Sequence, residues 1–453
     1  MGLFDIDLIN KYNRSGPRYT SYPTANNFSE LSLEDYKQQS VLSNRRRTSI
    51  SLYCHIPFCD TVCYYCGCNK VVTKDKSRAE PYIDALFKEI EIQSSLFDKE
   101  RLVEQMHFGG GTPTFFSGKQ IIRLSNKLQQ SFNFSPSGEY SIEIDPRGID
   151  EDLMESLAMA RFNRISLGVQ DFDLEVQKAV NRVQSFKQTK AVVELSRKNG
   201  FKSISIDLIY GLPRQSKDTF KRTLERVKEL RPDRISLFNY AHLPELFKPQ
   251  RRIVAEELPS PSEKLNIFHY SLEYLTGLGY IYIGMDHFAL PDDPLAIAQS
   301  DGNLYRNFQG YSTHSECDIV GLGLSSIGQV ADSFSQNEKS LEKYYQALKS
   351  GQLPINKGLI INQDDKIRRA LIMELICHFE VNISRLEERY SIKFTNYFAD
   401  SLEKLVEMQN DGLVELKSNS IKVMDRGKLL VRNICMLFDS YLELSDTSFS
   451  KTI

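Results

Sequence analysis

The stretch from Leu52 to Lys70 reads LYCHIPFCDTVCYYCGCNK, and it holds five of the eight cysteines of the chain. Three of them, Cys59, Cys63 and Cys66, are spaced C-x3-C-x2-C. The apolar run before them, from Ile50 to Ile56, predicts a β-strand. The cysteines therefore lie on a loop after a strand, where their close spacing allows the thiolates to turn towards one centre.

Three closely spaced thiolates predict a metal centre. A [4Fe–4S] cluster usually takes four cysteines, so a three-cysteine set leaves one iron open to bind a small molecule and pass it an electron. Two alternatives remain: a zinc ion with Cys68 or His55 as its fourth ligand, and inert buried cysteines. The lack of a second, distant C-x2-C pair in the sequence favours the cluster.

The composition narrows the class of protein. The chain has 453 residues and a formal net charge of −2, without the basic excess of a general nucleic-acid binder. No apolar run approaches the ~18 residues of a membrane span, and the first residues do not resemble a signal peptide. Clustered cysteines do not suggest a disulfide framework. We therefore expect a cytoplasmic protein with no nucleic-acid or membrane partner.

From Ser49 onwards, short apolar runs alternate with amphipathic stretches of helical period. This alternation predicts βαβ units around a parallel sheet, and six or seven units in a row favour a complete or partial barrel. The predicted strands are Ser49–His55, Gln105–Phe108, Tyr140–Ile144, Arg164–Leu167, Ser203–Leu208, Arg234–Phe238 and a seventh candidate, Tyr280–Gly284. The predicted helices include Ala79–Leu96, Glu151–Ala160, Gln188–Asn199, Lys217–Glu229 and Pro259–Gly277.

Polar or glycine-rich residues occur at the carboxyl end of each of the first six predicted strands. Because chemistry gathers at these ends in parallel barrels, they predict an active site along one rim. One of them, Gly109–Thr112, allows close approach of the backbone. Alone it favours a tight turn, and beside the cysteine loop it favours a site where backbone N–H groups bind the carboxylate of a ligand.

The chain divides into four expected segments: an N-terminal arm (1–46), a barrel (47–290), a segment that closes the active site (291–345) and a helical C-terminal domain (346–453). The arm contains Gly16–Thr24, which is either a surface extension or a cover over the site, with Arg18 and the tyrosines facing an anionic ligand. In the last segment we expect helices at Asp364–Phe379 and Thr395–Gln409, strands at Leu413–Leu416 and Ser420–Val423, and a final helix with Asp425 as its N-cap.

The cysteine motif, with Tyr65 before its last cysteine, resembles that of radical S-adenosylmethionine (SAM) enzymes. The longer string from Tyr53 to Lys70 is similar to that of oxygen-independent coproporphyrinogen III oxidases, also called coproporphyrinogen III dehydrogenases. This resemblance implies an α/β fold: a partial (β/α)6-type radical SAM barrel with a mostly helical C-terminal domain. The order of the last predicted helices and strands adds a winged-helix-like layout for that domain, and the first 46 residues add an N-terminal arm. The resemblance recurs at Gly16–Thr24, Gly109–Thr114, Ser141–Arg147, Gly168–Phe172, Asn181–Arg182, Ile206–Pro213, Phe238–Pro244, Gly284–Phe288, Asn307–Tyr311 and Arg432–Phe438.

The resemblance also implies roles for individual residues. Cys59, Cys63 and Cys66 would hold the [4Fe–4S] cluster, whose fourth iron binds SAM, and with Tyr53 they form the implied catalytic set. Cys68 matches a family cysteine that is not a ligand. Cys54 replaces a small apolar residue, and we expect it beside the cluster. The residues implied to bind SAM, as two molecules, are Tyr53, Tyr65, Gly110, Gly111, Thr112, Glu143, Gln170, Arg182, Asp207, Ala241 and Ile327.

The implied reaction belongs to porphyrin and haem biosynthesis. A 5′-deoxyadenosyl radical made from SAM would oxidise two propionates of coproporphyrinogen III to vinyls, giving protoporphyrinogen IX. The implied partners are this substrate and an electron donor such as flavodoxin or ferredoxin, and the chain is expected to be a monomer. The four substrate carboxylates require cations, for which Arg18, Arg147 and Arg306 are candidates.

Two rival functions fit part of the sequence. A related haem chaperone would bind and deliver haem, but that branch typically lacks the PRYTSYPT arm (residues 17–24) and the CGCN ending (residues 66–69), both present here. A different radical SAM activity, such as that of a methyltransferase, would fit the three cysteines alone.

Overall fold

The computed structural model describes residues 3–314 and 317–442, so the outermost residues of the expected arm and helical domain, and residues 315–316, lie outside the described residues. The chain forms two compact units. The barrel unit comprises Ser29–Leu278 and Glu316–Ile360, and the helical unit comprises Met1–Phe28, Gly279–Ser315 and Ile361–Ile453. The units interleave along the chain, whereas the four expected segments are consecutive; those segment limits stay a prediction.

A parallel sheet forms the centre of the barrel unit, and each strand pairs with the next in chain order. Its first six predicted strands are confirmed. Their apolar residues are buried, and at 140–144 and 164–170 these alternate with half-buried polar or glycine residues, so that the apolar side chains share the face that the helices cover. The strands are β1 (Ile50–Ile56), β4 (Leu102–Gly110), β5 (Asn133–Ile144), β6 (Arg164–Gln170), β7 (Ser203–Tyr210) and β8 (Arg234–Asn239).

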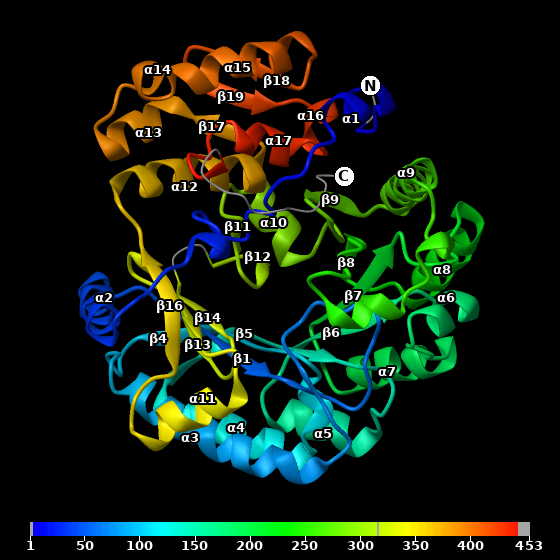
Figure 1. The fold of residues 1–453 in the computed structure, drawn as a ribbon, viewed down its shortest axis with the longest axis vertical. Helices are drawn as coiled ribbons and strands as arrows, with labels where there is room; N and C mark the ends of the chain where they lie inside the picture. The colour runs from blue at the N-terminus through cyan, green and yellow to red at the C-terminus, as the bar shows by residue number, and fades with distance from the viewer. Residues whose placement is uncertain (1–2, 315–316, 443–453) are drawn as a thin grey trace. The chain divides into compact units, whose positions relative to one another are not determined.

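Helices form an outer layer around this sheet, in which each long helix packs against the next (Figure 1). The predicted helices are confirmed, but α4 and the short α6 (Leu174–Ala179) were not predicted. A capping box of Ser117 and Gln120 starts α4, which buries Ile121, Leu124 and Leu128 along one face. The layer consists of α3 (Ala79–Ser94), α4 (Gly118–Ser131), α5 (Glu151–Met159), α7 (Phe186–Lys198), α8 (Lys217–Leu230) and α9 (Pro261–Gly277).

A seventh parallel strand, β13 (Asp318–Leu322), pairs with the free edge of β1. Gly321 lies opposite Tyr53, and a Cβ atom on it would come within 2.9 Å of the Ile327 backbone. Close strand packing therefore accounts for this glycine. The antiparallel strands β14 (Ile327–Val330), β15 (Ser333–Asn337) and β16 (Ile355–Ile360) extend the sheet, and α2 (Leu33–Arg46) and α11 (Leu341–Lys349) complete the unit.

The first part of the helical unit corrects one expectation. The seventh strand candidate forms β9 (Ile281–Gly284), which pairs antiparallel with β10 (His287–Ala289) and so is not a further βα unit. The position of a seventh parallel strand belongs to β13 instead. The helix α10 (Pro294–Ser300) and the hairpin of β11 (Tyr305–Asn307) and β12 (Gly310–Ser312) follow.

The last part of the helical unit has the expected winged-helix-like order. The helix at Asp364–Phe379 is confirmed, whereas each of the two later predicted helices is split in two. Asp425 is not an N-cap: Met424 occupies that position, and the Asp425 carboxylate pairs with Lys428 at 2.9 Å. The elements are α12 (Gln363–His378), β17 (Glu380–Asn382), α13 (Ile383–Tyr390), α14 (Phe394–Tyr397), α15 (Ala399–Asn410), β18 (Val414–Leu416), β19 (Ser420–Val423), α16 (Asp425–Lys428) and α17 (Val431–Met436).

The arm begins with α1 (Ile6–Tyr12) and continues without regular structure through Gly16–Thr24. Its tyrosines are buried within the helical unit, where Tyr19 donates a hydrogen bond to Asp439 and Tyr22 contacts Ser440. This part of the arm is therefore integrated into the unit by specific contacts. Over residues 3–314 and 317–442, the chain contains no helix with the length and hydropathy of a membrane span.

Candidate active site

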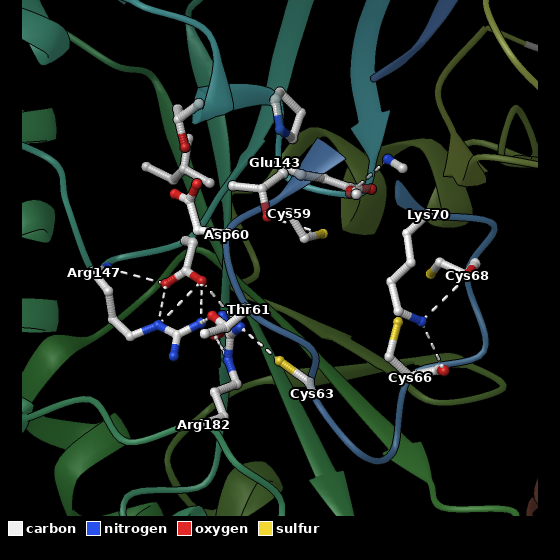
Figure 2. A pocket seen from close by; sticks show the side chains of 18 of the residues that line it. Cys59, Asp60, Thr61, Cys63, Cys66, Cys68, Lys70, Glu143, Arg147 and Arg182 are labelled. Carbon is white, nitrogen blue, oxygen red and sulfur yellow. Dashed lines mark hydrogen bonds and ion pairs between the residues drawn. The ribbon is translucent and has the colours of Figure 1, made fainter. Parts of the chain in front are cut away.

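A cavity of about 470 Å³ opens at the carboxyl ends of the parallel strands (Figure 2). Gly110, Ile144 and Gln170 lie at the ends of β4, β5 and β6, which confirms that the strand ends share one rim. The predicted residues that line the cavity are Cys59, Cys63, Tyr65, Cys66, Gly110, Gly111, Thr112, Glu143, Gln170, Arg182 and Asp207.

The cysteine loop is held by backbone contacts on both sides. The short strands β2 (Phe58–Cys59) and β3 (Val71–Val72) pair in parallel at its two ends. In its middle, the Tyr64 amide donates to the Val180 carbonyl at 3.0 Å, and the Asn181 side chain donates to the Val62 carbonyl at 2.8 Å. These contacts fix the loop without using the cysteine side chains.

The three motif cysteines carry free thiols that surround one space in the cavity (Figure 2). The Arg182 guanidinium donates to Cys63 Sγ at 3.5 Å, and the Thr112 hydroxyl donates to Cys59 Sγ at 3.5 Å. Among the described residues, no three His, Cys, Asp or Glu side chains converge on a single metal ion. Separated sulfur donors beside a cation suit a multi-iron cluster, which is larger than one ion and is bound by thiolates.

Two backbone N–H groups of the glycine run are engaged within the chain. The Gly111 and Thr112 amides donate to the Ile56 and Phe58 carbonyls, both at 2.8 Å, so their N–H groups do not face a ligand. A Cβ on Gly111 would lie 2.7 Å from the Phe58 carbonyl oxygen, and one on Gly110 would lie 2.5 Å from the His55 ring. The glycines therefore let the start of the cysteine loop pack directly on the end of β4.

Two carboxylates line the cavity: Glu143 on β5 and Asp207 on β7, with β6 between the two strands. Burial acts to raise the pKa of Glu143, but a hydrogen bond from His107 at 3.2 Å and the Gly110 amide at 3.2 Å outweigh it and lower that pKa. Burial, followed by the negative charge of Glu143, raises the pKa of Asp207 to about 6. Both groups are therefore ionised at neutral pH, and Glu143 more strongly so.

An ion-pair network also lines the cavity. Arg147 Nη2 lies 2.7 Å from Asp145 Oδ2, and Arg182 Nη1 lies 3.2 Å from the same oxygen. Arg182 also donates through Nε to the Gly168 carbonyl at 3.1 Å. Arg147, a candidate for binding a substrate carboxylate, therefore already has a carboxylate partner within the chain.

Tyr53, Ala241 and Ile327, which were expected to bind SAM, do not line the cavity, and neither do Cys54 and the substrate-binding candidates Arg18 and Arg306. The Tyr53 ring stacks on His107 at 5.9 Å, and its hydroxyl lies 3.1 Å from His55 Nδ1, so Tyr53 adjoins the Glu143 side of the site. The expectation that Cys54 lies beside the cluster is wrong. Cys54 is fully buried, and burial followed by the charge of Glu89 raises the pKa of its thiol.

Several cavity residues were missed because their types are common in loops and caps. Lys70 donates to the Cys66 carbonyl at 3.1 Å, and Ser166 donates to Asp207 at 3.2 Å. Ser166 lies on β6 two residues before Gly168, and alternate residues of a strand share one face. This spacing was the only sequence signal that could have placed Ser166 on the face of the sheet that lines the cavity. Asp60 and Thr61, between the first two motif cysteines, also line the cavity.

Two family models match the chain: the Radical SAM superfamily over residues 53–227 and the HemN C-terminal domain over residues 361–430. The chain is 52% identical to the oxygen-independent coproporphyrinogen III oxidase of Pseudomonas aeruginosa over 455 residues, covering 99% of both chains. It is 48% identical to the enzyme of that name from Escherichia coli over 442 residues, covering 97% of this chain and 96% of the relative.

A solved structure agrees with these matches. The coproporphyrinogen III oxidase (HemN) from Escherichia coli, described as a radical SAM enzyme, superimposes with a TM-score of 0.93 at 46% identity. The match covers 97% of this chain and 99% of the solved one. Near-complete coverage at this identity extends from the arm to the helical unit, so this chain belongs to the family of oxygen-independent coproporphyrinogen III oxidases within the radical SAM superfamily.

Proposed function

We propose that this chain converts coproporphyrinogen III to protoporphyrinogen IX by anaerobic oxidative decarboxylation in haem biosynthesis. Each of two propionates loses CO₂, gives one hydrogen atom to a 5′-deoxyadenosyl radical and one electron to an electron acceptor, and becomes a vinyl group. The observation that carries the proposal is the cavity that brings Cys59, Cys63 and Cys66 together with most of the residues expected to bind SAM. The names of the relatives support the choice of substrate.

In this proposal Cys59, Cys63 and Cys66 hold the [4Fe–4S] cluster, and SAM binds beside it. When bound, cluster and SAM supply a 5′-deoxyadenosyl radical that removes a hydrogen atom from a propionate β-carbon. Glu143, kept ionised by His107, can accept hydrogen bonds from the ammonium or hydroxyl groups of SAM. Arg182 keeps Asp145 paired and places a positive charge beside the Cys63 thiolate.

The proposal also includes the number of SAM molecules that bind, the electron donor and the oligomeric state. Two SAM molecules bind, and Tyr53, Ala241 and Ile327, which lie outside the cavity wall, serve one of them together with some of the lining residues. A small electron-transfer protein such as flavodoxin or ferredoxin supplies the electron. The enzyme acts as a cytoplasmic monomer, with no nucleic acid or membrane as a partner.

The test is an anaerobic assay of the cluster-reconstituted protein with SAM, a reductant and coproporphyrinogen III. Vinyl products and 5′-deoxyadenosine are measured together. We expect protoporphyrinogen IX with stoichiometric 5′-deoxyadenosine, and loss of both in Cys63→Ser. Cys317→Ser, a cysteine outside the cavity, serves as the matched control and retains both products.

Two results would contradict the proposal. SAM cleavage without any decarboxylation would point to another radical SAM reaction. Tight haem binding without turnover would point to a haem chaperone. Iron, sulfide and zinc contents measured on the same samples would separate a cluster from a zinc site.

A further inference from the structure

The helical unit contains a group of charged side chains, which we call the arginine cluster: Arg18, Arg306, Arg432 and Asp286. Arg18 Nη1 lies 3.0 Å from Asp286 Oδ2. Arg432 directs its guanidinium to backbone, with Nε 2.9 Å from the Pro17 carbonyl oxygen and a further hydrogen bond to the Gly16 carbonyl. The one carboxylate of the cluster is therefore engaged by Arg18.

Arg306 is the member of the cluster that lacks polar partners. Its side chain is only 5% exposed, yet among residues 3–314 and 317–442 neither Nε nor Nη1 has a hydrogen-bond acceptor. Its Cζ lies over an aromatic face, 4.7 Å from the centre of the Tyr311 ring. In the same hairpin, Gln309 Nε2 is also buried without a partner. Buried donors without acceptors are costly, and folded proteins rarely retain them without a reason.

The charges of the arginine cluster also favour an anionic ligand. Arg306 and Arg432 are both buried, and the positive charge of each lies close enough to affect the other. Burial, followed by the positive charge of Arg18 and assisted by that of Arg306, lowers the pKa of Arg432 to about 10 despite the opposing effect of Asp286. Such a cluster would gain stability from an anion that accepts hydrogen bonds from Arg306.

We propose that Arg306, flanked by Arg18 and Arg432, binds a carboxylate of the porphyrinogen substrate. The inference rests on the proposed function, because that function supplies a ligand with four propionates. A guanidinium suits this ligand since it is permanently charged and matches the planar carboxylate. SAM also carries a carboxylate, so the experiment must distinguish the two sources.

The experiment measures binding without turnover. Coproporphyrin III, the oxidised tetracarboxylate, and its tetramethyl ester, which has no free carboxylate, are titrated anaerobically into the cluster-reconstituted protein. The quenching of porphyrin fluorescence gives each dissociation constant. The variants are Arg306→Met, which keeps the side-chain length without the charge, and Arg306→Lys, which keeps the charge without the guanidinium fork.

Arg389→Met is the matched control. Arg389 also belongs to the helical unit and also lies over a tyrosine ring, with its Cζ 5.4 Å from the centre of Tyr390, but it is exposed and outside the cluster. Arg389→Met and Arg306→Met remove the same net charge. A loss of porphyrin affinity in Arg306→Met alone would therefore come from a local contact and not from a general electrostatic effect. Thermal unfolding midpoints of all variants confirm that each one is folded.

We expect Arg306→Met to weaken coproporphyrin III binding by about 10- to 100-fold, the usual range for one lost hydrogen-bonded charge contact. Arg306→Lys should recover part of this loss, ester binding should not change, and Arg389→Met should behave as the unsubstituted protein. In turnover, the KM for the porphyrinogen should rise in Arg306→Met while the KM for SAM stays constant.

Three outcomes would overturn the inference: unchanged coproporphyrin III binding in Arg306→Met, an equal loss in Arg389→Met, or a rise in the KM for SAM alone. If the unsubstituted protein neither binds coproporphyrin III nor turns over its porphyrinogen, the proposed function fails and the inference fails with it. If the unsubstituted protein does both and Arg306→Met does so equally well, only the inference fails.

Discussion

Two buried arginines, one in each unit, differ in how many hydrogen-bond acceptors surround them. Arg101 and Arg306 are both 5% exposed. In the barrel unit, every nitrogen of the Arg101 guanidinium donates a hydrogen bond, including one of 2.6 Å to Asp318 and one of 2.7 Å to the Thr48 carbonyl. In the helical unit, two nitrogens of Arg306 have no acceptor among the described residues.

The difference separates a structural role from a binding role. Arg101 joins the end of α2, through Ser43 and Asn44, to the start of β13, so its charge is neutralised within the fold. Arg306 gives the fold no comparable contact. A buried charge that the chain itself satisfies stabilises the folded state, whereas one that is left unsatisfied lowers stability until a ligand arrives.

The largest effect should follow from Arg101→Met. Removal of the guanidinium leaves Asp318 buried without its cation, and loss of one partner from a buried ion pair costs about 3–5 kcal/mol. We expect the free energy of unfolding of the barrel unit to fall by that amount. The measurement is chemical unfolding followed by tyrosine fluorescence, since the chain has 22 tyrosines and no tryptophan.

Arg46→Met is the control for this prediction. Arg46 pairs with Asp332 at 2.7 Å, but its side chain is 41% exposed. Exposed ion pairs contribute about 0–1 kcal/mol, so this variant should unfold almost as the unsubstituted protein does. An equally small effect of Arg101→Met would remove the contrast between the two arginines.

A buried acid with neutral partners should give the next largest effect. Burial raises the pKa of Glu89 from its ordinary value of 4.5 to about 7, against hydrogen bonds from Tyr344, the Gly323 amide and Asn337. Between these two pH values, the folded protein retains a proton that the unfolded chain has released. The free energy of unfolding should therefore fall as pH rises across this window, by about 3 kcal/mol in total.

Glu89→Gln tests this pH dependence because glutamine does not titrate. Between pH 5 and pH 8, stability should decline less steeply in the variant than in the unsubstituted protein, whatever the constant offset between them. Asp171 and Asp207 also have raised pKa values, so the difference between the two slopes, and not either slope alone, reports on Glu89. Parallel slopes would show that Glu89 does not titrate in this window.

The smallest effect, with the opposite sign to that of Arg101→Met, is expected for Arg306→Met. Methionine removes two buried donors without acceptors and relieves the repulsion on Arg432, and no partner is left unpaired. We expect the free energy of unfolding of the helical unit to stay within about 1 kcal/mol or to rise. A loss as large as that expected for Arg101→Met would mean that Arg306 is structural, and the contrast would be broken.

Local patterns predicted much of the barrel and of the cavity. The period of the apolar residues was sufficient for the first six strands, and the cysteine spacing predicted the centre of the site. The helix α4 was missed although Ser117 and Gln120 form a capping box and Ile121, Leu124 and Leu128 have helical spacing. Its polar residues, such as Lys119 and Gln129, obscured a narrow apolar face.

The remaining features depend on contacts between residues far apart in the chain. The amides of Gly111 and Thr112 were expected to bind a ligand, but they are used by the Ile56 and Phe58 carbonyls. The sequence alone cannot show that Arg306 lacks an acceptor, because its neighbours in the fold come from distant parts of the chain. The pairing of β13 was also not predictable from local patterns, because its parallel partner β1 lies much earlier in the sequence.

The pairing of β13 with β1 has a consequence for synthesis of the protein. Ile50 pairs with Asp318, and at 5–20 residues per second the ribosome needs on the order of 10–60 s to travel between them. Throughout that interval, one edge of the strand that leads into the cysteine loop has no neighbour and can pair with another nascent chain. We therefore expect the nascent chain to be most prone to pair with another chain before translation has passed Leu322.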